Sequence, residues 1–331
     1  MKDFDRLIAR FWEFGGWRLV WQYVKMGVLW VAVKELIRCA LTGRSVKMVY
    51  PKVTKLFDEK LIKKYDTQSE IAAPACWLSQ SEATERTIRE QSSLRYGASA
   101  YDNSIWFCWL QGIENAPELV KKCLESQREA FGEEVTVLDE SSYTDYVTLP
   151  DYIVEKRKKG YIPSALFSDM IRLELLIRYG GTWIDATVFA SPKIKEDGSR
   201  CQKIWQKIRE SELFIYRYFD KQGRVVGLSN WFIHAKEPGN PLLIEVRDSL
   251  YAYWKEYDCV VEYYIFHLFF GKAAKHHPEM IQKMPRGNSY HAIWLGEHAN
   301  IGNETWEQLM TNVPFHKLNW RKQTAFPSTK R

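Results

Sequence analysis

The amino-acid sequence predicts an α/β domain with a parallel sheet, preceded by a helical arm at the N-terminus. Two observations support the α/β class: a strand–helix–strand spacing over residues 105–138, and a passage from helix to strand over residues 161–189. The chain has 331 residues, 46% hydrophobic and 27% charged, which allows a sizeable core and excludes the disordered and collagen-like classes. Aromatic residues make up 15%, a density common at sugar, nucleotide and membrane surfaces as well as in cores.

The positive charge is concentrated near the N-terminus. Residues 1–65 hold 14 Lys and Arg against 6 Asp and Glu, whereas residues 66–331 hold 33 against 35. A nucleic-acid enzyme is expected to carry positive charge on its catalytic body, so this distribution argues against a nucleic-acid partner. The sequence therefore predicts a basic helical arm over residues 1–65 and one main domain over residues 66–331.

The arm is predicted to form two helical segments over residues 4–42, joined near Gly15 and Gly16. The first segment carries an apolar stripe opposite its charged residues. Residues 44–64 are rich in Lys and less periodic, and we predict a connector there.

Tryptophan and basic residues alternate in the second segment, which contains Trp17, Trp21 and Trp30. Its longest charge-free stretch, residues 26–33, is far shorter than the ~20 apolar residues that a membrane-spanning helix needs. Residues 1–44 can therefore lie in a membrane interface, with Trp at the headgroups and Lys and Arg toward anionic lipid. Packing on the main domain or on a partner subunit is the alternative, and the pattern leaves both open.

The cysteines indicate a reducing compartment, because they show no C-x-x-C pair and no clustered spacing. We expect them to be buried small hydrophobic residues. The N-terminus lacks the pattern of a secretory signal. The expected location is therefore cytoplasmic, with the arm peripheral on the inner face of the cell membrane. The six cysteines are Cys39, Cys76, Cys108, Cys123, Cys201 and Cys259.

The first strand of the main domain is the apolar run over residues 105–110, which ends at Gln111. A helix with an apolar face follows from Ala116 and Pro117, and residues 135–138 form the next strand. Because nucleotides bind at the carboxyl ends of such strands, Trp109 and Gln111 are placed to contact one. Plain core packing remains an equal explanation for Trp109.

A second helix is predicted over residues 164–179, with Ser164 at its N-terminus and Gly180 and Gly181 at its end. Asp169 and Arg172 share one face of this helix because they are three residues apart. The opposite, apolar side faces the core.

A strand is predicted over residues 182–189, directly after the two glycines. A period of two places Asp185 and Thr187 on the same face of this strand. A carboxylate and a hydroxyl at the end of a buried strand can hold Mg²⁺ or Mn²⁺, which prefer oxygen ligands and keep phosphate oxygens in their shell. Structural capping is the alternative explanation for an Asp in this position.

A β-hairpin is predicted further along the chain. Its strands are residues 213–219 and 224–228, and its turn lies at residues 221–223. Asn230 and Trp231 follow directly, and an Asn in this position can equally be a residue that ties a turn.

Taken together, these segments resemble the sugar-binding region with the DxD motif of retaining glycosyltransferases that have the GT-A (Rossmann-like) fold. This group is related to fungal α-mannosyltransferases and glucosylating clostridial toxins. The resemblance is strongest to the branch known as capsular polysaccharide synthesis proteins, and it spans about residues 100–320. The matching pieces are residues 105–112, 165–187 with the Tyr179–Thr187 block, 229–235 and 316–318.

The resemblance implies a role for each matched position. Trp109 would stack on the nucleotide base, Asp169 and Arg172 would bind donor hydroxyls or phosphate, and Asn230 would lie beneath the sugar. His316 and Lys317, expected in a late loop, would close over the diphosphate. The implied donor-binding residues are Trp109, Gln111, Asp169, Arg172, Gly181, Trp231, His316 and Lys317; the implied catalytic residues are Asp185 and Asn230.

The motif departs from the family pattern at its third position, where Thr187 replaces the second Asp. The resemblance implies Mn²⁺ or Mg²⁺ as the cofactor, with Asp185 and Thr187 as its protein ligands. A hydroxyl binds metal more weakly than a carboxylate does, so this departure lowers the affinity that we expect of the site for a metal.

The expected activity is that of a nucleotide-sugar-dependent hexosyltransferase in capsular polysaccharide biosynthesis. It would move a sugar from a nucleotide-sugar donor to a glycan or lipid-linked acceptor, with retention of configuration and dependence on a divalent metal. A catalytically silent, GT-A-like scaffold at the membrane in a polysaccharide assembly complex is the alternative, favoured by Thr187 and the basic arm.

Overall fold

A computed structural model describes the chain at residues 12, 16–42, 55–56, 58–65, 104–259, 264–298 and 302–320. The chain divides into two compact units, and three of the boundaries between them fall inside helices, namely Ser164–Tyr179, Pro241–Glu256 and Ile265–His276. The first unit comprises Met1–Glu85, Leu149–Phe167 and Glu245–Lys275; the second comprises Arg86–Thr148, Ser168–Ile244 and His276–Arg331.

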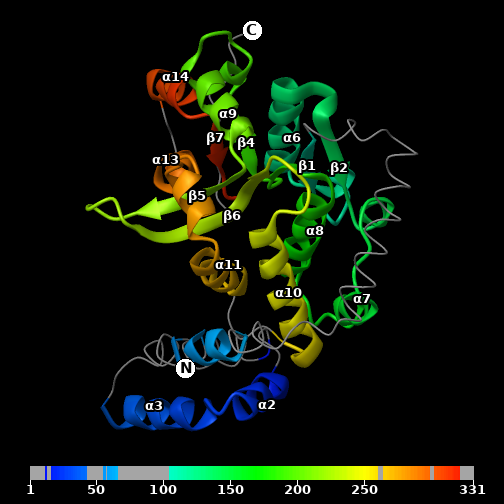
Figure 1. Ribbon diagram of the computed structural model, residues 1–331, viewed down its shortest axis with the longest axis vertical. Helices are drawn as coiled ribbons and strands as arrows, with labels where there is room; N and C mark the ends of the chain where they lie inside the picture. The colour runs from blue at the N-terminus through cyan, green and yellow to red at the C-terminus, as the bar shows by residue number, and fades with distance from the viewer. Residues whose placement is uncertain are drawn as a thin grey trace. The chain divides into compact units, whose positions relative to one another are not determined.

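The second unit is built on a five-stranded sheet with the order β2-β1-β3-β6-β5 (Figure 1). Strand β1 pairs in parallel with β2 and with β3, whereas β6 pairs antiparallel with both β3 and β5. This mixed sheet confirms the predicted α/β class. The strands are β1 (Ile105–Cys108), β2 (Val135–Leu138), β3 (Gly181–Ile184), β5 (Leu213–Phe219) and β6 (Val225–Ala235).

A two-stranded antiparallel sheet adds β4 (Val188–Ala190) and β7 (Phe315–Lys317). The single strand predicted over residues 182–189 is therefore wrong, because the chain leaves the main sheet after Ile184. The amide of Val188 donates to the carbonyl of Asp185 at 3.0 Å, which closes a turn between β3 and β4. The two strands then belong to different sheets.

The helices around the sheet have apolar faces that meet the core. Helix α6 packs against β2 and β4, and α13 packs against β5 and β7. Helix α8 has the predicted bounds. The helices beyond the arm are α6 (Glu118–Phe131), α7 (Asp151–Lys158), α8 (Ser164–Tyr179), α9 (Arg200–Glu210), α10 (Pro241–Glu256), α11 (Ile265–His276), α12 (Pro278–Lys283), α13 (Ser289–Glu297) and α14 (Asn303–Asn312). Short 3₁₀ turns lie at Ile113–Asn115, Gly132–Glu134, Tyr143–Asp145 and Pro192–Ile194.

The arm is helical in the first unit, but it breaks where one helix was predicted. Helix α2 (Trp17–Lys25) ends before Gly27, which has a φ of 61°, and α3 (Leu29–Thr42) begins after it. Residues 58–65 are also helical, which corrects the predicted connector. The first predicted segment lies outside the described residues except for Trp12.

Four of the six cysteines are described in full, and all four are buried free thiols, as predicted: Cys108, Cys123, Cys201 and Cys259. Burial raises the pKa of the Cys108 and Cys123 thiols to about 12, so both stay protonated near neutral pH.

Candidate functional site

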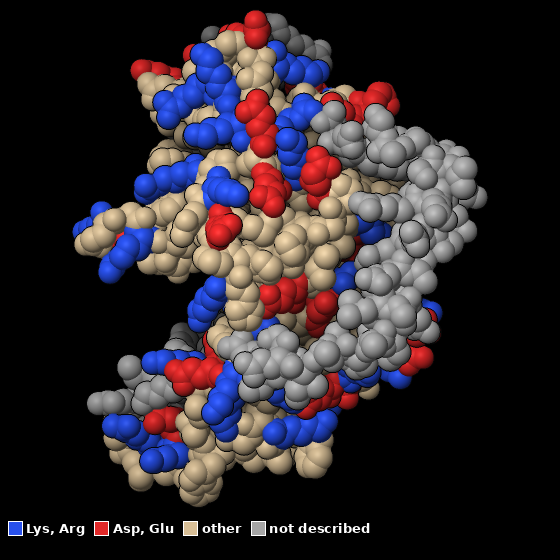
Figure 2. Space-filling model, in the orientation of Figure 1, with Lys and Arg blue, Asp and Glu red and all other residues tan. Residues whose placement is uncertain are grey.

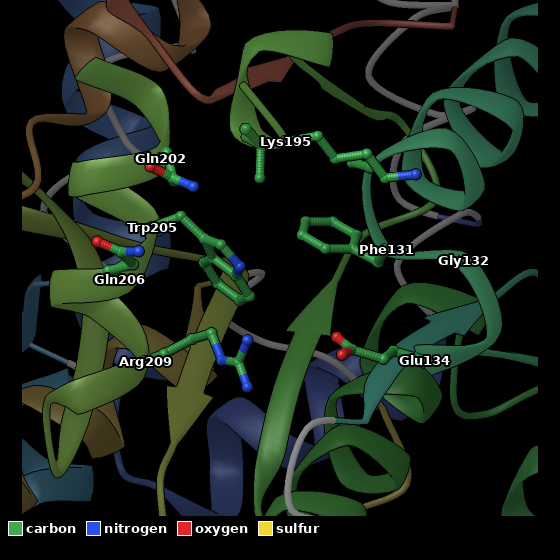
Figure 3. Close-up of a pocket in the computed structure, with 10 residues that line it drawn as sticks. Phe131, Gly132, Glu134, Lys195, Gln202, Trp205, Gln206 and Arg209 are labelled. Carbon is green, nitrogen blue, oxygen red and sulfur yellow. The ribbon is translucent and has the colours of Figure 1, made fainter. Parts of the chain in front are cut away.

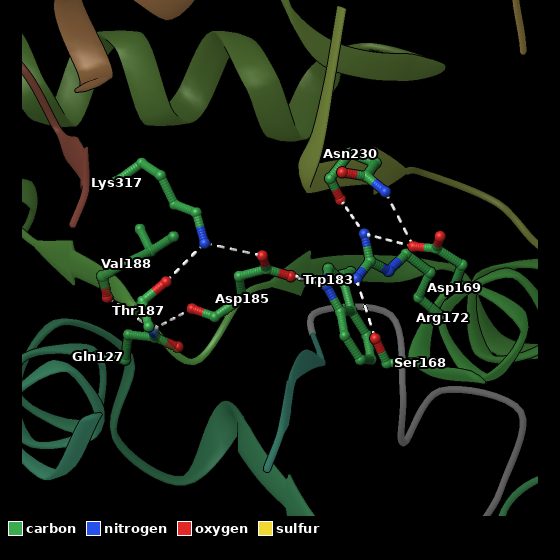
Figure 4. A network of polar contacts seen from close by, with 10 residues as sticks. All are labelled: Gln127, Ser168, Asp169, Arg172, Trp183, Asp185, Thr187, Val188, Asn230 and Lys317. Carbon is green, nitrogen blue, oxygen red and sulfur yellow. Dashed lines mark hydrogen bonds and ion pairs between the residues drawn. The ribbon is translucent and has the colours of Figure 1, made fainter. Parts of the chain in front are cut away.

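Helix α8 contributes the two buried charged residues of the site, Asp169 and Arg172, which are 3% and 4% exposed. One helical turn brings them together, and Arg172 Nη1 lies 3.2 Å from Asp169 Oδ1. Arg172 Nη2 also contacts the Ser168 hydroxyl at 3.3 Å (Figure 4). Two opposite charges buried this deeply stabilise each other only if both remain paired.

Asp185 reaches the same guanidinium from the end of β3. Its Oδ1 lies 3.2 Å from Arg172 Nη2 and accepts a hydrogen bond of 2.8 Å from the Trp183 indole. Its amide donates to the carbonyl of Trp231 on β6 at 2.8 Å. Arg172 also lies over the Trp183 ring, 4.7 Å from the centroid. The turn after Ile184 therefore does not carry Asp185 away from the site.

Asn230 closes the other side of the Asp169–Arg172 pair. Its amide donates to Asp169 Oδ1 at 2.8 Å, and its backbone carbonyl accepts from Arg172 Nη1. The residue lies inside β6, which runs longer than the predicted second strand of the hairpin. The interpretation of Asn230 as a turn residue is therefore wrong.

Lys317 joins the site from β7. Its Nζ donates to Asp185 Oδ2 at 2.9 Å and to the Thr187 hydroxyl at 2.5 Å. The pairing of β4 with β7 sets Val188 opposite Lys317, and the Leu318 amide donates to the Thr187 carbonyl at 2.8 Å. Lys317 is thus in a strand, where the sequence predicted a loop.

The two carboxylates of the site differ in their affinity for a proton. Burial raises the pKa of Asp169 to about 7, and the opposing effect of Arg172 only partly offsets it. Burial also acts on Asp185, but Lys317 and Arg172 outweigh it and hold the pKa of Asp185 below its ordinary value. At neutral pH the cluster therefore combines two cations with one full and one partial negative charge, and this suits an anionic ligand.

The predicted metal ligands do not fit a divalent cation in this arrangement. Asp185 Oδ2 and Thr187 Oγ1 are both bound by the Lys317 ammonium. The second oxygen of Asp185 is bound by Arg172 and Trp183. Among the described residues, no group of three His, Cys, Asp or Glu residues is placed to hold a metal. A cation at this position would have to displace Lys317.

Trp109 and Gln111 lie at the carboxyl end of β1, as predicted, although the strand ends at Cys108, two residues earlier than expected. Trp109 is half-buried and packs against the cluster that contains Phe107 and Ala186, so core packing accounts for part of its ring. Its buried indole nitrogen has no hydrogen-bond partner among the described residues. Gln111 is exposed. Both positions are compatible with the predicted contact to a nucleotide.

Two predicted donor contacts are better explained by packing. Trp231 is buried in β6 and stacks on Tyr216, with ring centroids 4.5 Å apart. Gly181 is buried at the start of β3 with a φ of 85°, and a Cβ there would lie 2.5 Å from the Ser104 carbonyl oxygen. The glycine is thus needed for the close approach of β1 and β3.

His316 is fully buried, and the structure gives no support to its predicted contact with a donor. Neighbouring residues of a strand point to opposite faces, so His316 faces away from the side on which Lys317 meets Asp185. Burial lowers the pKa of His316 to about 3, which keeps the ring neutral. The resemblance pointed to His316 and Lys317 together, whereas the geometry places only Lys317 in the site.

Trp183 and Gln127 support the site but were not predicted as site residues. Trp183 orients Asp185, and the fully buried Gln127 of α6 donates to the Val188 carbonyl at 2.9 Å. The alternation of residues on β3 could have indicated Trp183. A single amide on the inner face of an amphipathic helix gave no comparable signal for Gln127.

A pocket of about 300 Å³ lies elsewhere in the second unit (Figure 3). Its wall includes Gly132 and Glu134, which precede β2, whereas the polar cluster lies beyond the carboxyl end of β3. Ligands of parallel α/β sheets bind at the carboxyl ends of the strands. We therefore do not assign this pocket to the polar site. Its aromatic wall is formed by Phe131 and Trp205.

The fold and the charged cluster are those of an α/β protein with a site suited to an anionic ligand. The sequence profile of the family described as "Capsular polysaccharide synthesis protein" matches residues 48–330. The chain belongs to this family, as the sequence resemblance predicted.

Two glycosyltransferases are similar to part of the chain. The O-glycosyltransferase PaGT of Phomopsis amygdali is 26% identical over 167 residues, which is 46% of this chain and 39% of that protein. The O-glycosyltransferase braB of Annulohypoxylon truncatum is 28% identical over 159 residues, 43% of this chain and 35% of that protein. The chain therefore spans well under half of the length of these relatives. A solved structure, the PaToxG glycosyltransferase, aligns with 62% of this chain and 83% of its own at 15% identity and a TM-score of 0.36.

Proposed function

We propose that this protein is a glycosyltransferase that moves a hexose from a nucleotide-sugar donor to a glycan or lipid-linked acceptor in capsular polysaccharide biosynthesis. The observation that carries the proposal is the partly buried cluster of Asp169, Arg172 and Asp185, joined by Asn230 and Lys317. Membership of the family and the similarity to two O-glycosyltransferases support the reaction class.

Each part of the cluster has a task in donor binding. The cations Arg172 and Lys317 attract the diphosphate, and charge-assisted hydrogen bonds to phosphate are among the stronger polar contacts. Asp169 and the Asn230 amide provide an acceptor and a donor for the hydroxyls of the sugar. Trp109 lies beyond the end of β1, where a base can stack on it.

Retention of configuration is part of the proposal. Asp185 is held as an ion pair by Arg172 and Lys317, which makes it a weak proton acceptor. In a transfer on one face of the sugar, the leaving diphosphate takes the proton of the acceptor hydroxyl, so no dedicated base is required. Analysis of the product anomer by NMR tests this point, since an inverted product would contradict it.

The proposed place of action is the inner face of the cell membrane, with the exposed face of α2 and α3 on the lipid. Trp17, Trp21 and Trp30 are 72%, 62% and 74% exposed. In Figure 2, Lys and Arg side chains lie between uncharged atoms over this part of the surface. Within the residues that the structure describes, no helix is long and apolar enough to cross a bilayer.

The competing proposal is a silent scaffold with a GT-A-like body. Lys317 covers the predicted metal ligands Asp185 and Thr187, and this favours the scaffold. The intact cluster around Arg172 favours the enzyme. A scaffold predicts donor binding without turnover, and an enzyme predicts hydrolysis of the donor, even at a slow rate.

The test is a screen of sugar nucleotides by thermal shift, followed by assays of hydrolysis and transfer. The wild type is compared with Asp185→Asn and with Asp145→Asn, a matched change of an exposed acid in the same unit. Stabilisation by one donor that is lost in Asp185→Asn alone, together with turnover, supports the transferase. A ligand at 100 times its Kd adds about 2.7 kcal/mol of apparent stability, which such a screen detects. The absence of any response contradicts the proposal.

A further inference from the structure

We propose that the ammonium group of Lys317 takes the place of the divalent cation, so that the donor diphosphate binds and leaves without a metal. The inference rests on the proposed glycosyltransferase function and specifies how that site handles the charge of its leaving group. It follows from the position of Lys317, which binds the side-chain oxygens of Asp185 and Thr187 that were predicted to bind Mn²⁺ or Mg²⁺.

The contacts of Lys317 are those expected of a cation in the metal position. Its Nζ lies 2.9 Å from Asp185 Oδ2 and 2.5 Å from Thr187 Oγ1. An ammonium has three N–H donors, and these two contacts use two of them. The third has no partner among the described residues, and the side chain is 24% exposed, so it can bind a phosphate oxygen.

The backbone holds this lysine in place before any ligand arrives. Residues 315–317 pair with β4, and the Leu318 amide donates to the Thr187 carbonyl. Gly296 of α13 approaches so closely that a Cβ there would lie 2.5 Å from the Lys317 carbonyl oxygen. A hydrogen-bond donor that is fixed in this way, as the Lys317 ammonium is, needs little reorganisation when charge develops on the ligand.

The charges of the cluster also disfavour a metal beside Lys317. Asp185 already faces two cations, Arg172 and Lys317, at 3.2 and 2.9 Å. A divalent ion on the same carboxylate would bring two further positive charges within a few ångströms of both, and repulsion at that distance is strong in a partly buried site. A diphosphate supplies the opposite charge and relieves this repulsion.

The transfer step balances with the lysine in this position. The bond between the anomeric carbon and the diphosphate oxygen breaks, and its electron pair remains on that oxygen, where Lys317 stabilises the new charge. A hydroxyl oxygen of the acceptor forms the new bond to the anomeric carbon on the same face. Its proton passes to the departing diphosphate.

The experiment measures the binding of inorganic pyrophosphate and of UDP, GDP and ADP by calorimetry, first in EDTA and then with Mn²⁺. Lys317→Met removes the charge at similar length, and Lys317→Arg retains it. Lys203→Met is the matched control, because Lys203 is exposed on α9 of the same unit. Thermal unfolding checks that each variant is folded. Electron paramagnetic resonance of Mn²⁺ alone provides a second readout.

We expect the wild type to bind pyrophosphate or one of the nucleotides in EDTA, with no gain on addition of Mn²⁺. Lys317→Met should weaken this binding at least tenfold, Lys317→Arg should retain most of it, and Lys203→Met should change nothing. The resonance experiment should detect protein-bound Mn²⁺, as a loss of the free-ion signal, only with Lys317→Met, where Asp185 and Thr187 are uncovered.

Binding that requires Mn²⁺ and Asp185 but is unchanged in Lys317→Met would overturn the inference and leave the glycosyltransferase standing. If no diphosphate binds with or without Mn²⁺, the proposed function fails as well. If Lys317→Met is unfolded, binding of diphosphate by the wild type in EDTA and with Mn²⁺ is the test. A requirement for Mn²⁺ in the wild type contradicts the inference, and binding in EDTA supports it.

Discussion

The guanidinium of Arg172 contacts both carboxylates of the site, the Ser168 hydroxyl and the Asn230 carbonyl. These partners come from α8, from the end of β3 and from β6. Arginine is suited to this task because its planar fork presents several donors in fixed directions, which a lysine cannot do. The residue therefore links the elements of the site as well as supplying charge to it.

Arg172→Gln should lower the free energy of unfolding by about 3 kcal/mol at pH 8, because it leaves Asp169 and Asp185 without their shared partner. Urea denaturation measures this loss. Arg224→Gln removes an exposed ion pair with Asp220 and should cost less than about 1 kcal/mol. Equal losses in the two variants would show that Arg172 has no special part in the cluster.

Asp169 makes stability depend on pH in the direction opposite to an ordinary ion-paired carboxylate. Its folded pKa is about 7, against about 3.9 in an unfolded chain, so the folded state holds the proton more tightly. The contribution of Asp169 to the free energy of unfolding is fully present at low pH and is lost as the pH rises from about 4 to 7. Between pH 5 and pH 8 the loss should be about 2–3 kcal/mol.

Urea denaturation of the wild type and Asp169→Asn at pH 5 and pH 8 isolates this effect. The buried histidines His234 and His316, with pKa values lowered to about 4 and about 3, act in the opposite direction but are the same in both proteins. Asp169→Asn should therefore lose less stability than the wild type between the two pH values. An identical pH dependence of the two proteins would contradict the raised pKa of Asp169.

At the residue scale, the sequence indicated which chemical groups meet but not all of their contacts. The helical spacing of Asp169 and Arg172 predicts their shared face, and the strand after the glycines brings Asp185 near them. Lys317 is 132 positions from Asp185, so its contact depends on a strand pairing that no local pattern encodes. For the same reason, the burial of its neighbour His316 could not be predicted.

At the scale of elements, patterns within a segment predicted the structure well and breaks between segments poorly. Helix α8 and strand β2 have the predicted bounds. The strand predicted after Gly181 was too long, because apolar and polar residues keep alternating through Asp185, Ala186 and Thr187 while the backbone turns. A turn without Gly or Pro leaves little trace in the sequence. After this turn, β4 pairs with β7 instead of continuing the main sheet.

Gly181→Ala tests how closely β1 and β3 must approach. Gly198 offers a matched control, because it also has a positive φ, 71°, but nothing lies within 4 Å of a Cβ there. Gly198→Ala should lower the free energy of unfolding by about 1 kcal/mol, because an alanine there has to adopt the left-handed backbone conformation. Gly181→Ala should cost at least about 2 kcal/mol more, since its Cβ meets the Ser104 carbonyl and the strands have to separate. Equal losses by urea denaturation would mean that the strands adjust freely.

At the scale of the whole chain, the division into units could not be predicted from linear composition. The first unit combines the arm with Leu149–Phe167 and Glu245–Lys275, which lie within the range assigned to the main domain. Gln22 of α2 is buried and donates to the Tyr253 hydroxyl and the Cys259 carbonyl, both at 3.0 Å. The arm thus packs through one face, as one of the two sequence interpretations held, while its tryptophans are exposed on another.

This packing decides how the proposed membrane contact has to be tested. Deletion of residues 1–44 would uncover Tyr253 and Cys259 and could unfold the first unit, so point variants are the appropriate tool. We expect Trp17→Ser/Trp21→Ser/Trp30→Ser to reduce co-sedimentation with phosphatidylglycerol vesicles at least fivefold, because these rings supply the apolar part of the interfacial binding.

Trp320→Ser, which alters a tryptophan that is 49% exposed in the second unit, should leave vesicle binding unchanged. Binding should also be weaker on phosphatidylcholine and at 0.5 M salt, since Lys25, Lys34 and Arg38 are exposed beside the tryptophans and their attraction to anionic lipid is screened by salt. If the triple variant sediments with anionic vesicles as the wild type does, the exposed face of α2 and α3 is not the membrane contact.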